Sequence, residues 1–155
     1  MTDLAHTTIE QQLTVLLRRG TRIHLATQHG NITLERSAYG IMCKLADEGP
    51  QRLGALAVAF GLDPSTITRQ VQDLERNGLV AREDHPLDGR VSVLRMTASG
   101  RQVLRKSRRH RRARLQKALS EWSAADLTDL GRLLKEFNAS LDGLTESREL
   151  QQARR

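Results

Sequence analysis

The most restrictive feature of this sequence is a pair of short amphipathic segments separated by three residues. Apolar residues recur at helical spacing in LGALAVAF, which ends before Gly61, and in PSTITRQVQDLER, which follows Asp63. Asp63 is a favourable N-cap because its carboxylate accepts from free amides, and Pro64 suits the first turn because it has no amide hydrogen to lose. Asn77-Gly78 supplies a left-handed stop. The pattern predicts two short helices joined by a tight turn.

The residues after this pair alternate with period two. LVARED at 79–84 and VSVLRMT at 91–97 predict two strands, and the tip HPLDGR between them is expected to bend at Asp88-Gly89. Two short helices followed by a hairpin define a winged helix-turn-helix, in which the second helix of the pair enters the DNA major groove. The predicted fold is mainly α with a small β-hairpin wing.

The outer face of the second helix carries side chains that such a helix could present to DNA. Hydroxyls can donate or accept, glutamine can pair in bidentate fashion with adenine, and arginine can fork onto guanine. The helix N-terminus is also a favourable place for a phosphate. An ordinary solvated helix face is the alternative. The candidate recognition residues are Ser65, Thr66, Thr68, Arg69 and Gln70.

Further helices are predicted before the winged unit. An apolar stripe that starts at Ile9 predicts an N-terminal helix, which Thr7 or Thr8 could cap. A second helix is expected to be entered from Thr33 and stopped by the Gly-Pro pair at 49–50.

Two more helices are predicted after the wing. Thr97 is placed to cap the first of them, and Ser123 with Asp126 forms a capping-box pattern ahead of the second. The last helix has apolar residues at alternating spacings of three and four. The first and last helices of the chain therefore carry apolar stripes that a small winged core does not need, which predicts a partner for them.

The helix after the wing contains a strongly basic run. RKSRRHRRAR, from Arg105 to Arg114, includes one apolar residue, Ala113. A helix that is polar on every side usually bridges two lobes through solvent or is unstable alone. The cations could contact DNA phosphates, line a solvated bridge or pair with acidic residues of another subunit. We favour the bridge, with one or two residues near DNA.

Composition narrows the partner. The net charge of +7 at pH 7 favours nucleic acid, an acidic membrane surface or an acidic protein. The longest mostly apolar run, LGALAVAFGL, is about half of the ~20 residues that cross a bilayer, and the N-terminus lacks a signal-peptide pattern. We therefore expect a soluble cytoplasmic protein without a membrane partner.

No catalytic or metal-binding pattern stands out. A nucleophile elbow, a phosphate loop and a metal-hydrolase motif are all missing from the sequence, so we expect neither an enzyme nor a cofactor. His24 and His29 are five apart, off the spacing of one helix face, and the 5 histidines form no cluster. The single cysteine, Cys43, excludes an internal disulfide, and its apolar neighbours favour a small core residue over a redox sensor.

The segments STITRQVQDLERNGLVAR at 65–82 and DHPLDGRVSVLRMTASG at 84–100 together resemble the MarR family of bacterial transcriptional regulators. The resemblance lies in the hydroxyl-rich helix, in the GLV that follows it, in Arg82 and in the wing motif Asp88-Gly89-Arg90. The order of helices extends it to nearly the whole chain. Met96 departs from the usual ending of the second wing strand, at a position that needs only an apolar side chain.

The resemblance implies a homodimer whose terminal helices intertwine and whose two winged lobes bind a palindromic operator. In the family, the arginine at the Arg90 position reaches the minor groove from the wing tip, and the aspartate at the Asp88 position helps to hold it. Arg90 could instead be a plain turn residue. Arg82 could reach a phosphate or pair with Asp84 or Glu83. Members of the family commonly respond to a small, often aromatic, effector.

The expected function is a ligand-responsive repressor that binds double-stranded DNA. Two other classes stay open: a winged-helix interaction module for an acidic protein, and a non-specific nucleic-acid-binding protein that uses its basic surface. The expected organisation is an N-terminal dimerisation helix at 7–32, a winged helix-turn-helix lobe at 33–100, a linking helix at 101–122, a C-terminal dimerisation helix at 123–146 and a disordered tail at 147–155.

Overall fold

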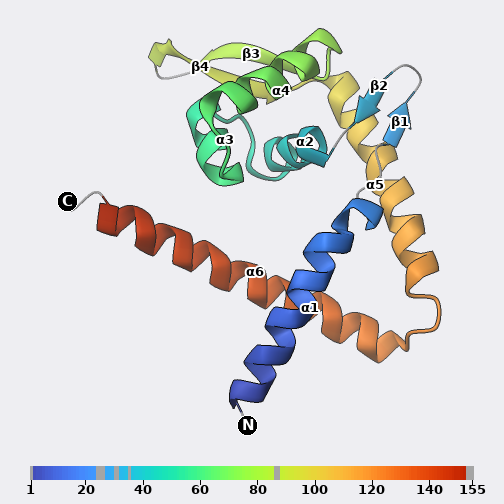
Figure 1. Cartoon of the computed structure of the whole chain (residues 1–155). Helices are drawn as coiled ribbons and strands as arrows, with labels where there is room; N and C mark the ends of the chain where they lie inside the picture. Colours follow the sequence, from blue (N-terminus) through green and yellow to red (C-terminus); the bar gives the residue numbers. More distant parts are fainter. Residues whose placement is uncertain (1, 24–26, 30–31, 35, 86–87, 153–155) are drawn as a thin grey trace. The chain divides into compact units, whose positions relative to one another are not determined.

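The computed structural model describes residues 2–23, 27–29, 32–34, 36–85 and 88–152, with their side chains at 3–19, 34, 36–83 and 92–143 (Figure 1). The described part is mainly helical and divides into two compact units, Met1–Leu115 and Gln116–Arg155. The elements, in chain order, are α1 (Thr2–Ile23), β1 (Thr27–His29), β2 (Ile32–Leu34), α2 (Arg36–Glu48), α3 (Leu53–Phe60), α4 (Pro64–Arg76), β3 (Val80–His85), β4 (Asp88–Met96), α5 (Ala98–Ala118) and α6 (Ala124–Gln152).

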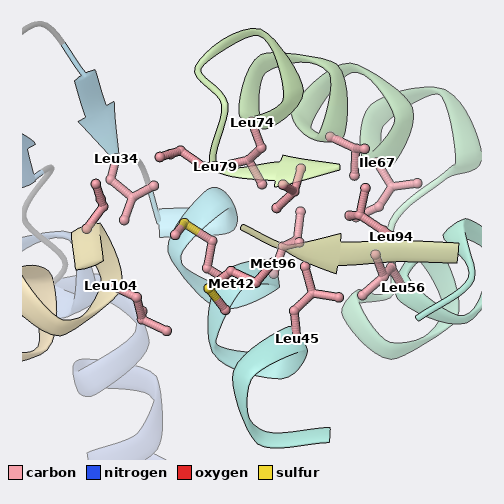
Figure 2. Packing of buried hydrophobic residues seen from close by; sticks show 14 of the residues in the cluster. Leu34, Met42, Leu45, Leu56, Ile67, Leu74, Leu79, Leu94, Met96 and Leu104 are labelled. Atoms are coloured by element: carbon pink, nitrogen blue, oxygen red, sulfur yellow. The ribbon is translucent and has the colours of Figure 1, made fainter. Parts of the chain in front are cut away.

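The first unit contains the hydrophobic core, to which α2, α3, α4, the hairpin and the start of α5 all contribute (Figure 2). Ile67, Val71 and Leu74 lie on one side of α4 and are almost completely buried. Each contributes about 1.5–3 kcal/mol by leaving water. Their burial leaves the opposite side of α4 facing out, which is the arrangement that the apolar spacing of this segment predicts.

Local signals define both ends of α4, as the sequence predicts. The carboxylate of Asp63 accepts from the amide of Thr66 at 2.9 Å, and Pro64 occupies the first turn. At the other end Gly78 has φ +66°, a left-handed conformation that costs glycine little. The turn between α3 and α4 is fixed in the same way, because Gly61 follows α3 with φ +58°.

The wing is an antiparallel pair, β3 and β4, in which Val80 lies opposite Met96. Gln51, just before α3, adds a bridge on the other side of β4, since its amide and carbonyl both bond to Leu94, at 3.1 and 2.8 Å. The predicted bend at Asp88-Gly89 is wrong in its position, because both residues already belong to β4.

The start of α5 is joined tightly to the start of β3. Thr97 caps the helix as predicted, with its hydroxyl accepting from the amide of Gly100 at 3.0 Å and donating to the carbonyl of Gly78 at 2.7 Å. A Cβ atom on Gly100 would lie 2.0 Å from the carbonyl oxygen of Leu79. This position therefore requires glycine because of the close approach of two backbones.

The N-terminal region differs from the sequence prediction. Thr7 and Thr8 do not cap α1; they lie inside it, and their hydroxyls bond to carbonyl oxygens four residues earlier, each at 3.0 Å. Thr33 does not lead into a helix, because it belongs to β2, which pairs with β1 in a small hairpin. Strands of three residues show too little alternation to be recognised in sequence.

The second unit consists of the end of α5 and the long helix α6. Ser123 caps α6 as predicted: its hydroxyl accepts from the amide of Asp126 at 3.1 Å and donates to the carboxylate of that residue at 2.5 Å. The predicted disordered tail is wrong up to Gln152, where α6 ends, and 153–155 lie outside the described residues. None of the described helices is both long and apolar enough to span a membrane.

Candidate nucleic-acid interface

The structure places all the predicted recognition residues on the first part of α4, around its outward side. Ser65 and Arg69 are exposed, whereas Thr66, Thr68 and Gln70 are half-buried. Because Ile67 and Val71 hold the opposite side in the core, the orientation of this surface is fixed by the packing of the lobe. The surface is therefore a rigid feature of the winged unit.

The hydroxyl groups on this surface already use their hydrogens within the protein. Ser65 donates to one carboxylate oxygen of Asp63 at 2.5 Å, and Thr66 donates to the other at 2.6 Å. Thr68 donates to the carbonyl oxygen of Pro64 at 2.6 Å. A hydroxyl has one hydrogen and two lone pairs, so each of these three hydroxyls has only acceptor capacity left for a ligand. The segment Asp-Pro-Ser-Thr contains the signal for this arrangement, since an N-cap aspartate can accept from the residues just after it.

Asp63 carries a fixed negative charge at the start of α4. Hydrogen bonds from the Ser65 and Thr66 side chains, and from the Thr66 amide, hold the pKa of its carboxyl well below its usual value of 3.8. The carboxylate therefore occupies the amides that a phosphate could otherwise bind at this helix N-terminus. The expectation of a phosphate at this place does not fit the geometry.

Arg69 and Gln70 are presented differently. Arg69 is exposed, and no acidic group within the described residues forms an ion pair with it. The side-chain oxygen of Gln70 is buried and has no hydrogen-bond partner in the described part of the chain. A bidentate contact with adenine needs both ends of the amide, so Gln70 would have to rotate first. Arg69 is the better placed of the two.

Within the wing, the structure gives a partner for Arg82 that sequence reasoning missed. Its Nε donates to the carboxylate of Glu75 on α4 at 2.9 Å, and no ion pair with Glu83 is found among the described side chains. The side chain of Asp84, the other predicted partner, lies outside the described residues. Glu83 instead pairs with Arg95 across the hairpin. The Arg82–Glu75 contact links the wing to α4, and no local sequence pattern predicts it.

Asp88 and Arg90 both lie on β4, at the tip of the wing. Their side chains lie outside the described residues, as does that of Asp84. The structure therefore gives the strand that carries the two predicted wing residues, and it gives neither of their side-chain positions.

The basic run on α5 separates into two sets of side chains. Arg105, Arg109 and Arg112 are exposed. Arg108 and Arg111 instead contact α2. Arg108 forms an ion pair with Asp47 at 2.9 Å, and the guanidinium of Arg111 lies 3.6 Å from the centroid of the Tyr39 ring. The helix is therefore packed on one side rather than solvated on all sides.

Comparison with known proteins also singles out the winged lobe. A model of the MarR family matches residues 34–92. YxaD of Bacillus subtilis (strain 168), an uncharacterised HTH-type transcriptional regulator, is 38% identical over 131 residues, which cover 84% of this chain and 90% of YxaD. The similarity thus extends from the winged lobe over most of the chain.

Solved structures share the fold. A MarR family protein from Bacillus stearothermophilus superposes with a TM-score of 0.71 at 24% identity, covering 92% of this chain and 99% of that one. FabT of Streptococcus pneumoniae, determined in complex with DNA, gives a TM-score of 0.58 at 20% identity, covering 92% of this chain and 96% of its own. At these identities the likeness is one of architecture.

Proposed function

The chain belongs to the MarR family of transcriptional regulators, and on this premise we propose that it is a repressor that binds a specific double-stranded operator as a homodimer. The proposal is carried by the outward side of α4. Arg69 is exposed there, beside hydroxyls whose hydrogens are bonded within the protein, and the opposite side of the helix is packed in the core. Because a bacterial transcriptional regulator binds chromosomal DNA, we place this protein in the cytoplasm.

We assign roles on α4 from the chemistry of each side chain. Arg69 would fork onto guanine O6 and N7, and Ser65, Thr66 and Thr68 would accept from base amino groups. Gln70 would reach adenine after rotation.

In the wing, Arg90 would enter the minor groove with Asp88 holding it. Arg82 would brace the wing against α4 through Glu75, with a phosphate as its second possible neighbour.

The homodimer is supported by apolar side chains that the chain alone leaves exposed. Leu16 and Leu17 on α1 are 45% and 69% exposed, and Leu134 and Phe137 on α6 are 44% and 36% exposed. Trp122, at the entrance to α6, lines an open hollow of about 470 Å³. A two-fold dimer that buries these surfaces would carry two copies of α4, which calls for a palindromic operator with half-sites about one helical turn apart.

We propose that a small molecule regulates this binding. Two arrangements of the dimer that differ in the spacing of the α4 helices would have different DNA affinities, and a ligand that prefers the wrongly spaced one would release DNA. The effect would be limited by the differential affinity of the ligand for the two arrangements. Aromatic compounds are the first class to test, because the family resemblance implies a small, often aromatic, effector.

A mobility-shift titration tests the function. The purified protein is mixed with DNA from upstream of its own gene, in the presence of unrelated competitor DNA and at two salt concentrations. We expect a discrete complex of dimer size that survives the competitor. Binding that disappears into competitor for every candidate operator, and that collapses as salt is raised, would instead point to a sequence-blind basic surface.

A further inference from the structure

Two arginines of the basic run on α5 are directed at one side of α2. Tyr39, Cys43 and Asp47 are spaced by four on α2, so they lie along a single face of that helix. The guanidinium of Arg108 forms an ion pair with Asp47 at 2.9 Å, and the guanidinium of Arg111 lies 3.6 Å from the centroid of the Tyr39 ring. The two contacts lie about two turns apart along α2.

The contacts persist at neutral pH. Burial raises the pKa of the Tyr39 hydroxyl, and a hydrogen bond with Cys43 raises it further, so the phenol stays neutral. The hydrogen bond that Arg108 donates to Asp47 raises the pKa of Arg108, and its guanidinium therefore remains charged. Cys43 lies on the same face of α2, one turn from Tyr39 and one turn from Asp47.

The same side of α5 enters the core one to two turns earlier. Val103, Leu104 and Ser107 are buried there, at 8%, 3% and 0% exposure. Arg111 lies about 10 Å further along the helix axis than Leu104. A single point of contact would let α5 pivot on the lobe, whereas two points separated along its axis fix the direction of that axis relative to the lobe. The second point is made by polar and aromatic contacts because the apolar stripe of α5 has ended.

This direction matters because α5 is the helix by which the chain leaves the winged lobe (Figure 1). A change in its angle is amplified with distance from the lobe. In a dimer built on the helices that follow, the angle would set where each α4 is presented to DNA.

We propose that Tyr39, Asp47, Arg108 and Arg111 form an α2–α5 clamp that positions the recognition helix for DNA binding without contacting DNA itself. The proposal rests on the DNA-binding function proposed above. These four are positioning residues. Arg108 and Arg111 contact α2, and the exposed cations of the basic run do not share that role.

The decisive variant is Asp47→Asn. It removes the ion pair with Arg108 while making the protein more positive, so simple attraction to phosphates predicts unchanged or tighter DNA binding. The clamp predicts the opposite sign: we expect specific operator affinity to fall about two- to five-fold, the range for an exposed ion pair. The dependence of affinity on salt should keep the wild-type slope, because no phosphate contact is lost.

Two further variants give a rescue and a control. Exchanging the charges, with Asp47→Arg and Arg108→Asp in one chain, should recover the affinity lost in Asp47→Asn, which a merely destabilising change would not do. Arg109→Ala is the matched control, since this exposed neighbour has no ion pair among the described residues. Arg109→Ala should leave the packing of α5 on α2 unchanged. If Arg109 contacts a phosphate, its loss should reduce the slope of affinity against salt concentration by about 1.

Amide hydrogen exchange of the free protein separates this proposal from the function on which it rests. Asp47→Asn should speed exchange across 105–115, whereas Arg109→Ala should not. If wild-type protein binds no operator, the proposed function fails. The clamp is overturned if exchange of 105–115 is unchanged in Asp47→Asn, or if the variant binds operator as tightly as wild type.

Discussion

Asp63 has two roles at the residue scale, since one carboxylate caps α4 and also takes the hydrogens of the Ser65 and Thr66 hydroxyls. The first role stabilises the helix, and the second determines how the helix surface appears to a ligand. Because both roles need the ionised form, the recognition surface and the stability of α4 depend on the same charge.

The stability of the protein should therefore fall at acid pH in a way that involves Asp63. Its pKa is lower in the folded chain than its ordinary value of 3.8, so its contribution is complete above that value and is lost as pH falls below it. We expect the wild-type Tm to drop between about pH 4 and pH 2. Thermal unfolding of Asp63→Asn, which keeps an N-cap acceptor without the charge, should show a flatter profile over this range. Identical profiles for the two proteins would contradict the assignment.

Arg69 should account for base-specific affinity. We expect Arg69→Ala to weaken specific operator binding by about 1–3 kcal/mol and to relax the preference at one base position of each half-site. Arg76→Ala is the matched control, because this arginine lies at the other end of α4 and pairs with Asp73. Fluorescence anisotropy with operator and scrambled duplexes measures both effects. An equal loss on both duplexes after Arg69→Ala would mean that Arg69 contacts only phosphates.

At the scale of elements, the junction of β3 and α5 is the place where backbones approach most closely. Gly100→Ala would put a Cβ atom 2.0 Å from the carbonyl oxygen of Leu79, which neither backbone can avoid without moving. We expect a loss of about 1–3 kcal/mol in the free energy of unfolding, measured by urea denaturation.

Gly54 provides the control for this change. A Cβ atom there meets nothing within 4 Å, and its φ is ordinary. Gly54→Ala should therefore be neutral or stabilising by up to about 1 kcal/mol, because alanine loses less backbone entropy in a helix. If both variants lost the same stability, the close approach of β3 and α5 would not be the cause.

The elements that the sequence predicts correctly are those with a local chemical signal. The caps and stops formed by Asp63, Gly61, Gly78 and Thr97 each involve residues a few positions away, and each is the one expected. The small hairpin before α2 was missed because three-residue strands have almost no pattern.

The long-range contacts of the candidate site could not be predicted from the sequence. The partners of Arg82 and Arg108 lie 7 and 61 residues away, and only the packed fold brings those carboxylates near. The outward side of α4 could be predicted because the apolar spacing of this segment determines which side is buried. The use of its hydroxyl hydrogens was not predicted, although it depends on neighbouring residues.

At the scale of the whole molecule, none of the described side chains of the second unit, at 116–143, is buried. The exposed leucines and Phe137 on α6 are the surface that a partner subunit would bury. We expect the wild-type protein to sediment as a dimer and Leu134→Glu to shift it toward monomer with loss of the discrete operator complex. Lys135→Ala, at an exposed neighbouring position, should stay dimeric. Analytical ultracentrifugation decides the outcome, and a variant Leu134→Glu that remains a tight dimer would exclude this face of α6 from the interface.

The inward-bonded hydroxyls of α4 have a consequence for DNA chemistry. Groups that only accept would favour the amino groups of adenine and cytosine, whose free hydrogens point into the major groove. Methylation of adenine at N6 or of cytosine at N4 replaces such a hydrogen. An operator modified in this way under Ser65, Thr66 or Thr68 would bind more weakly, whereas methylation at cytosine C5 would leave those bonds in place. The regulator would thereby be sensitive to the methylation state of its own binding site.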